Sequence, residues 1–151
     1  MITTMQVKDA GRLTSGIEYL VDMHWRENPH FAEYLEWPEW KELTYELIRD
    51  NFRAEGLIID QTGTAVAATI WMPAMDIHYG RVAVPIAHMV DPFWRGTGGV
   101  LRDLSKLREQ CIRALVCERY LNVQHISPVQ QRQTLRTLRG KGTEENHQAI
   151  L

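Results

Sequence analysis

Apolar residues in the first third of the chain recur every three or four positions, the spacing of an amphipathic helix. Ser15 and Glu18 form a capping-box pattern, so a first helix is predicted from this point to about Arg26. Pro38, a favoured first-turn residue, begins a second predicted helix that closes around Phe52. The predicted apolar stripes are Ile17, Leu20, Val21 and Trp25 in the first helix, and Trp40, Leu43, Leu47 and Ile48 in the second.

The middle of the chain changes to β-rich runs separated by turn residues. Residues 56–60 and 64–72 flank a glycine-containing turn at 61–63, which predicts a β-hairpin. Residues 82–90 are apolar and β-branched, which predicts a third strand, buried on both faces. Pro85 within it cannot donate to a strand ladder, so it marks an edge or a bulge.

The last third predicts a helix after residue 99, a strand at 120–126 and a final basic helix at 128–138. With a short first strand at 5–7, and a further short strand at 148–151 as an option, the order is β-α-α-β-β-β-α-β-α-(β). This order predicts an α/β chain, and its length suits a single domain over residues 1–151.

Charge divides the chain, although the net charge is only −2. Residues 1–94 carry seven Lys/Arg against fourteen Asp/Glu, whereas residues 95–142 carry ten against three. This polarity indicates an anionic ligand in the C-terminal half, and a solvated basic helix face is the alternative. Nucleic acid is a disfavoured partner because the sequence pI is near 6.3 and the N-terminal half is acidic.

Several features indicate a cytoplasmic protein without a metal centre. No apolar run approaches the length of a membrane span, and the first residues lack the layout of a signal peptide. Cys111 and Cys117 form no disulfide framework and are expected to be buried thiols. The histidines and cysteines lack metal-ligand spacing, so no metal is expected.

The stretch Arg95-Gly96-Thr97-Gly98-Gly99 stands between a predicted strand and a predicted helix. Glycines let a ligand approach the backbone closely, and the N–H groups and dipole of a helix N-terminus attract anions. Arg95 adds a positive charge. The stretch is neither a P-loop nor a Gly-x-Gly-x-x-Gly dinucleotide fingerprint, and it predicts a phosphate or pyrophosphate site.

Residues 90–99, from Val90-Asp91-Pro92 to Gly98-Gly99, resemble motif A of the GNAT family of N-acetyltransferases. That motif is a strand ending in Val-x-Pro, then Arg/Gln-x-x-Gly-x-Gly/Ala and a helix. The element order resembles the short members encoded by bacteria and phages over most of the chain. The resemblance implies a GNAT-like mixed central sheet flanked by helices, and an acetyl-CoA-dependent N-acyltransferase that lets an amine attack the acetyl group directly.

The same resemblance implies where acetyl-CoA would bind. The pyrophosphate would lie on the loop, and Met89 and Val90 would contact the pantetheine arm and the thioester. The implied loop residues are Arg95, Gly96, Thr97, Gly98, Gly99 and Val100.

Candidate catalytic chemistry is sparse. His88, near the end of the third predicted strand, is the best-placed general base, and a satisfied core histidine is the alternative. Asp76 and His78 precede that strand and could reach an active cleft, but exposed loop residues are the favoured interpretation.

The segment 31–40 interleaves aromatic and acidic residues. In GNAT-like folds this region borders the acceptor site, so Glu33, Tyr34, Glu36 and Trp37 are predicted to bind a cationic amine. Core packing is one alternative. A protein partner or self-assembly through the aromatic residues is another, because interfaces favour Trp and Tyr.

Two positions depart from the GNAT pattern. Val100 stands where the motif has a small residue, and Arg136 occupies the slot of a tyrosine that protonates the leaving thiolate on the last helix. Arginine is a poor acid. A catalytically silent GNAT-fold protein is therefore the second hypothesis, for example a phage virion component or a host-directed phage factor.

Overall fold

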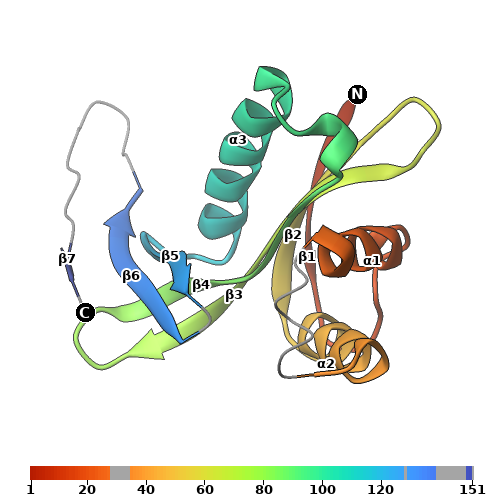
Figure 1. Cartoon of the computed structure of the whole chain (residues 1–151). Helices are drawn as coiled ribbons and strands as arrows, with labels where there is room; N and C mark the ends of the chain where they lie inside the picture. The colour runs from red at the N-terminus through yellow and green to blue at the C-terminus, as the bar shows by residue number, and fades with distance from the viewer. Residues whose placement is uncertain (28–34, 128, 139–148, 151) are drawn as a thin grey trace.

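The computed structural model describes residues 1–27, 35–127, 129–138 and 149–150. Within these ranges the strands form a single sheet in the order of the chain, β1 to β7 (Figure 1). Neighbouring strands are antiparallel except β4 and β5, which are parallel and connected through helix α3. The elements are β1 Ile2–Lys8, α1 Ile17–Glu27, α2 Trp37–Arg49, β2 Arg53–Ile59, β3 Ala65–Asp76, β4 Gly80–Val90, the 3₁₀ turn η2 Pro92–Trp94, α3 Gly98–Ala114, β5 Arg119–Ser127, β6 Gln130–Thr137 and β7 Ala149–Ile150.

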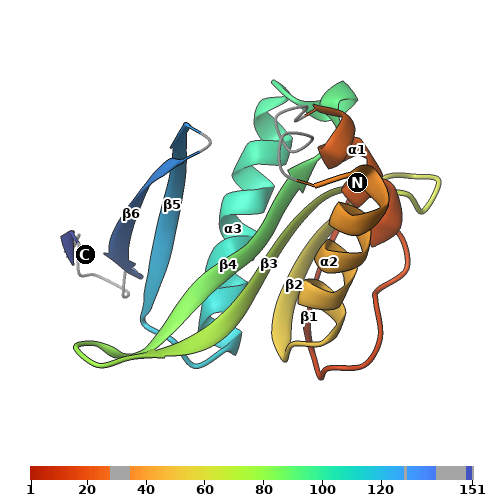
Figure 2. The same cartoon turned by 60° about the horizontal axis from the view of Figure 1, so that its bottom comes forward.

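The helices lie on opposite faces of the sheet (Figure 2). Helix α1 buries Ile17 and Leu20 against β2, β3 and β4, next to Ile48 of α2. Helix α3 covers the other face, where Leu107 packs on Ile58. The predicted pair of helices, the hairpin and the helix after the glycine loop are therefore confirmed. Part of the predicted α2 stripe is wrong, because Leu43 and Leu47 expose 55% and 47% of their surface.

Strands β3 and β4 form a long hairpin with one irregularity. Ile70 pairs with Ala87 and Trp71 pairs with Pro85, so Ile86 is an extra residue on β4. The bulge lies beside Pro85, as predicted from the missing proline N–H. Most of β4 is only partly buried, so the prediction of a strand buried on both faces is wrong for much of its length.

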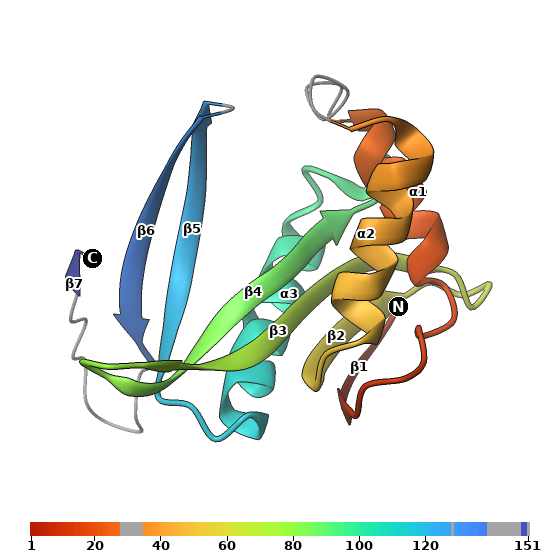
Figure 3. The same ribbon diagram turned by 90° about the horizontal axis from the view of Figure 1, so that it is seen from below.

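Strand β4 separates from β5 soon after the two strands meet. Their ladder contains only the pairs Val82↔Arg119 and Ala83↔Tyr120. Figure 3 shows the strands diverging from this point, with β5 and β6 leaving as a hairpin of their own. Residues 84–90 of β4 therefore lack a strand neighbour on the β5 side among the described residues.

The predicted final helix at 128–138 is wrong. Residues 130–137 form β6, which pairs antiparallel with β5 and buries Leu135 while Arg132 and Arg136 stay exposed. Pairing with β5 overrides the helix propensity of a segment rich in glutamine, arginine and leucine. The optional last strand is present as β7, which pairs with β6. No helix in the described part of the chain is long and apolar enough to cross a membrane.

Candidate functional site

The glycine loop is fixed at its start by Asp91, which follows β4 and is 8% exposed. Its carboxylate accepts hydrogen bonds from the backbone N–H of Phe93 at 3.1 Å and from the Tyr19 hydroxyl on α1 at 2.8 Å. The hydrogen bond to the carboxylate raises the pKa of Tyr19. Gly96 then turns the chain with φ of +82°, a conformation that favours glycine. These contacts hold the loop between β4 and α3.

Part of the loop backbone is left open to a ligand. The N–H groups of Arg95, Thr97 and Val100 donate to carbonyls within the loop. Those of Gly96, Gly98 and Gly99 have no acceptor among the described residues. A Cβ atom added at any of these three glycines would meet nothing within 4 Å. Exposed amides at a helix N-terminus with open space above them fit an anionic phosphate group.

Val100 does not obstruct this space. It is 4% exposed and packs in one buried cluster with Ile58, Val66 and Leu107. Its side chain is therefore accommodated by the interior between α3 and the sheet. The departure from the small residue of motif A leaves the exposed amides of the loop accessible.

Arg95 has a partner before any ligand binds. Its guanidinium lies 3.4 Å from the Glu27 carboxylate at the end of α1, and the side chains are 48% and 40% exposed. Exposed pairs of this kind are worth little in water, about 0–1 kcal/mol. Arg95 can therefore exchange Glu27 for a more highly charged phosphate at small cost.

His88 lies on the part of β4 that has left β5, and the residue is exposed. Its Nδ1 atom is 2.9 Å from the Thr69 hydroxyl oxygen, which accepts a hydrogen bond from Trp71 Nε1 at 2.7 Å. Desolvation by the surrounding protein, with a smaller effect of the Arg108 cation, lowers the pKa of His88 to about 4. The imidazole is therefore neutral at pH 7, and a role as general base stays a prediction.

Met89 and Val90 follow His88 within residues 84–90, the part of β4 that does not pair with β5. Met89 is 2% exposed and packs towards α1, whereas Val90 packs towards α3. Both side chains are occupied by packing. A contact with a pantetheine arm would therefore use their backbone.

The predicted acceptor region is only partly described. Glu33 and Tyr34 lie outside the described residues. Glu36 is exposed, and Trp37 packs its ring 5.5 Å from that of Trp25 on α1. The Trp37 contact favours a packing role for this aromatic residue, while Glu36 stays available to a ligand.

Asp76 is the last residue of β3, and His78 lies in the turn between β3 and β4. The Asp76 carboxylate accepts hydrogen bonds from the backbone N–H of His78 at 2.7 Å and of Tyr79 at 3.0 Å. The favoured interpretation as exposed loop residues holds for His78, whereas Asp76 is half-buried at the end of a strand. In the part of the chain that the structure describes, no group of three or more His, Cys, Asp or Glu side chains could hold a metal ion.

Sequence reasoning missed the residues that support the site. Tyr19 and Glu27 reach the loop from α1, and no local pattern links them to it. Thr69 and Trp71 are two positions apart on one strand, which places their side chains on one face. Their contact with His88 depends on the register of β3 against β4, which the sequence pattern does not specify.

The fold is similar to that of known acetyltransferases. No protein-family model and no curated protein matches the sequence. An aminoglycoside 6′-N-acetyltransferase solved with coenzyme A superposes with a TM-score of 0.57 at 16% identity over 82% of this chain, which spans only 62% of that enzyme.

Two further structures agree. A GNAT family acetyltransferase of Staphylococcus aureus gives a TM-score of 0.51 at 11% identity, covering 78% of this chain and 83% of that one. An acetyltransferase of Streptococcus agalactiae gives 0.50 at 16% identity, covering 83% and 76%. These similarities show that the chain has the fold of the GNAT acetyltransferases.

Proposed function

We propose that the chain binds acetyl-CoA along the free edge of β4 and transfers the acetyl group to an amine. The observation that carries the proposal is the combination of two features of β4. After Ala83 the strand has no strand neighbour on the β5 side within the described residues, and beyond Val90 it leads into a loop whose glycine amides lack an acceptor there. An extended ligand can add to such an edge through backbone hydrogen bonds.

The chain's own residues would divide the binding between them. Alternate backbone N–H and C=O groups of residues 84–90 face the side that β5 has left, where they can pair with the amides of a pantetheine arm. The N–H groups of Gly96, Gly98 and Gly99, with Arg95, would hold the pyrophosphate.

The reaction needs little from the protein besides position and polarity. The amine nitrogen attacks the thioester carbon, a C–N bond forms, the C–S bond breaks, and the proton lost from nitrogen ends on the sulfur of CoA. A backbone N–H near Met89 or Val90 is proposed to donate to the thioester oxygen as it gains negative charge. The exposed Glu36 carboxylate is proposed to favour a cationic amine on the acceptor side.

The second candidate is a GNAT-fold protein without catalysis. One observation favours it. Residues 130–137 form a strand where the last helix was predicted, and Arg136 is exposed on that strand. The predicted helix-borne position of an acid for the leaving thiolate is therefore absent from the described residues. Such a protein would have a structural or interaction role, in a virion or elsewhere. That role would also have to explain the exposed amides of the glycine loop.

Isothermal titration of the purified chain with acetyl-CoA tests the proposal, with desulfo-CoA as a ligand that lacks the thiol. Gly98→Pro is the sharpest variant. It removes one free N–H at the first position of α3, where proline is tolerated, and Thr97 before it already has the extended backbone that precedes proline. Loss of a hydrogen bond to a charged group, worth about 1.5–3 kcal/mol, predicts roughly 10- to 100-fold weaker binding.

A matched pair of charge variants completes the test. Arg95→Glu should weaken binding at least about 10-fold, whereas Glu27→Gln, which frees Arg95, should strengthen it a few-fold. Equal affinities for all variants would place the ligand elsewhere. Absence of binding at millimolar acetyl-CoA would refute the proposal and favour the silent protein.

A further inference from the structure

The hydroxyl of Thr69 has a limited set of hydrogen-bonding options. It is 2% exposed, and its oxygen accepts the indole proton of Trp71. The hydroxyl has one proton of its own, and within the described residues its only further partner is His88 Nδ1 at 2.9 Å. Were Nδ1 also protonated, the Thr69 proton would be left unpaired in a buried position, which costs free energy.

The chain of hydrogen bonds therefore has a direction. Trp71 donates to Thr69, and Thr69 donates to Nδ1 of His88. A neutral imidazole carries a single proton, so that proton lies on Nε2. The two ring nitrogens flank Cε1, and their hydrogen bonds point in widely different directions. Because Nδ1 faces Thr69 on β3, Nε2–H faces away from β3.

The position of His88 gives this N–H a use. The residue is exposed and lies in residues 84–90 of β4, which have no strand neighbour on the β5 side in the part of the chain that the structure describes. We propose that His88 is a fixed hydrogen-bond donor whose Nε2–H contacts a carbonyl oxygen of the acyl-pantetheine arm, and that Thr69 is the positioning residue that sets this tautomer. The inference rests on the proposed function, because it concerns the same ligand. No proton is transferred to or from His88 in this role.

The surroundings of the ring favour a donor over a base. Arg108 on α3 is the charged group that acts on His88, and its guanidinium lies over the Tyr120 ring of β5 with 5.3 Å to the centroid. The Trp71 ring contacts both His88 and Tyr120, with centroids 5.2 and 5.7 Å away. A neighbouring cation disfavours an imidazolium, and it attracts the same carbonyl oxygen that Nε2–H would contact.

The tautomer can be measured without any ligand. Long-range ¹H–¹⁵N spectra of the histidine-labelled full chain at pH 7 distinguish protonated from unprotonated ring nitrogens, and His88→Gln assigns the signals. The expected result is a proton on Nε2 and none on Nδ1. In Thr69→Val the two tautomers should mix, whereas Thr69→Ser should preserve the wild-type pattern. A proton on Nδ1 in the wild type, or an unchanged pattern in a folded Thr69→Val variant, would overturn the assignment.

The ligand contact is tested on the same sample. Acetyl-CoA should shift the Nε2–H signal of His88, while desulfo-CoA, which lacks the thioester, should shift it less.

Calorimetry with two variants tests the same contact. His88→Gln keeps an N–H near the place of Nε2 and should bind acetyl-CoA within about 3-fold of wild type, whereas His88→Leu should bind roughly 10-fold more weakly. Equal binding by both variants, or an unmoved signal in a sample that binds acetyl-CoA, would overturn the donor role. If acetyl-CoA does not bind at all, the proposed function and the donor role fall together, while the tautomer is still decided by the ligand-free spectra.

Discussion

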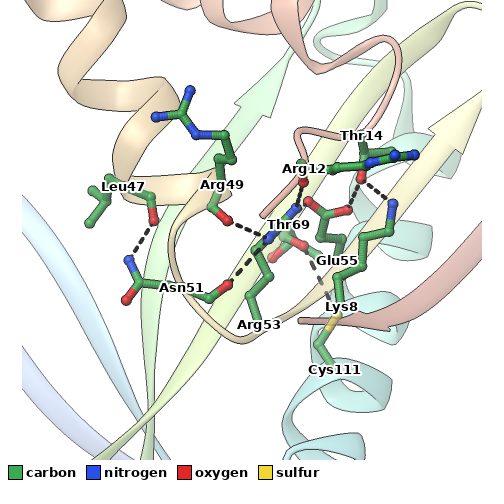
Figure 4. A network of polar contacts seen from close by, with 10 residues as sticks. All are labelled: Lys8, Arg12, Thr14, Leu47, Arg49, Asn51, Arg53, Glu55, Thr69 and Cys111. Carbon is green, nitrogen blue, oxygen red and sulfur yellow. Dashed lines mark hydrogen bonds and ion pairs between the residues drawn. The ribbon is translucent and has the colours of Figure 1, made fainter. Parts of the chain in front are cut away.

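Removing the buried Arg53 should be among the most damaging single changes to stability in this chain. Its guanidinium is fully buried and donates to the Glu55 carboxylate at 2.9 Å (Figure 4). It also donates to the backbone carbonyls of Arg12 at 2.7 Å, Asn51 at 3.2 Å and Arg49 at 3.4 Å. One side chain thus connects β2 to the end of α2 and to the segment before α1.

The size of the effect follows from what is left behind. In Arg53→Met the hydroxyl of Thr14, which receives a hydrogen bond from Lys8, is the one partner of the buried Glu55 carboxylate that remains among the described residues. The three backbone carbonyls lose the Arg53 donor. Breaking a buried ion pair by removing one partner costs about 3–5 kcal/mol. For a chain of this size that corresponds to a fall of about 6–20 °C in Tm.

Urea unfolding followed by circular dichroism measures this cost through a double-mutant cycle. Arg53→Met and Glu55→Leu should each be strongly destabilising. The double variant should lose less than the sum of the two by at least about 1 kcal/mol, because it buries no unpaired charge. Arg26→Met is the matched control. It removes an exposed pair with Asp22 and should cost under about 0.5 kcal/mol. An Arg53→Met cost no larger than the control, or strict additivity in the cycle, would refute the reasoning.

Three further predictions concern packing and titration. A Cβ at Gly56 would come within 2.8 Å of a side-chain carbon of α3, so Gly56→Ala should cost about 1–3 kcal/mol in urea unfolding, whereas Gly98→Ala, with open space, should be close to neutral. The pKa of His88 is lowered from 6.5 to about 4, so the unfolded chain binds the proton more readily. The free energy of unfolding, measured in urea, should therefore fall as the pH drops from 6.5 towards 4. In the His88→Gln variant the contribution of this residue to the fall should be absent. Burial raises the pKa of Cys111 to about 12 and also raises that of Cys117, so neither thiol should react with a disulfide reagent until urea unfolds the chain. Rapid labelling of both thiols in the native protein would contradict their burial.

Much of the fold could be predicted from local patterns. The capping box, the first-turn Pro38 and the glycine turn at 61–63 mark boundaries that the structure keeps within a few residues. The missing N–H of Pro85 is a local property, so the sequence alone predicted an edge or a bulge at this position, and the bulge is present. The helix predicted at 128–138 was wrong because helix propensity is a local property of under about 1 kcal/mol per residue. Pairing of this segment with β5 is a tertiary interaction, and it outweighs that propensity.

In the candidate site, too, local features could be predicted from the sequence, whereas contacts between distant residues could not. Glycines at a strand-to-helix transition are visible in sequence, and the loop has the free amides that they imply. The surroundings of His88 were not predictable, since Thr69 is 19 residues away and the contact requires the β3–β4 register. The pairing of Arg95 with Glu27, 68 residues apart, likewise needs α1 to be placed beside the loop.

Acetyl-CoA bound along residues 84–90 of β4 and across the glycine loop would change the chemical environment of the backbone amides there. A ¹H–¹⁵N titration of the full chain with acetyl-CoA detects this change residue by residue. The largest shifts are expected for the amides of Val84, of residues 86–90 and of Gly96, Gly98 and Gly99, with little change in β1 and β2. Shifts confined to other elements, or none at millimolar acetyl-CoA, would contradict this mode of binding.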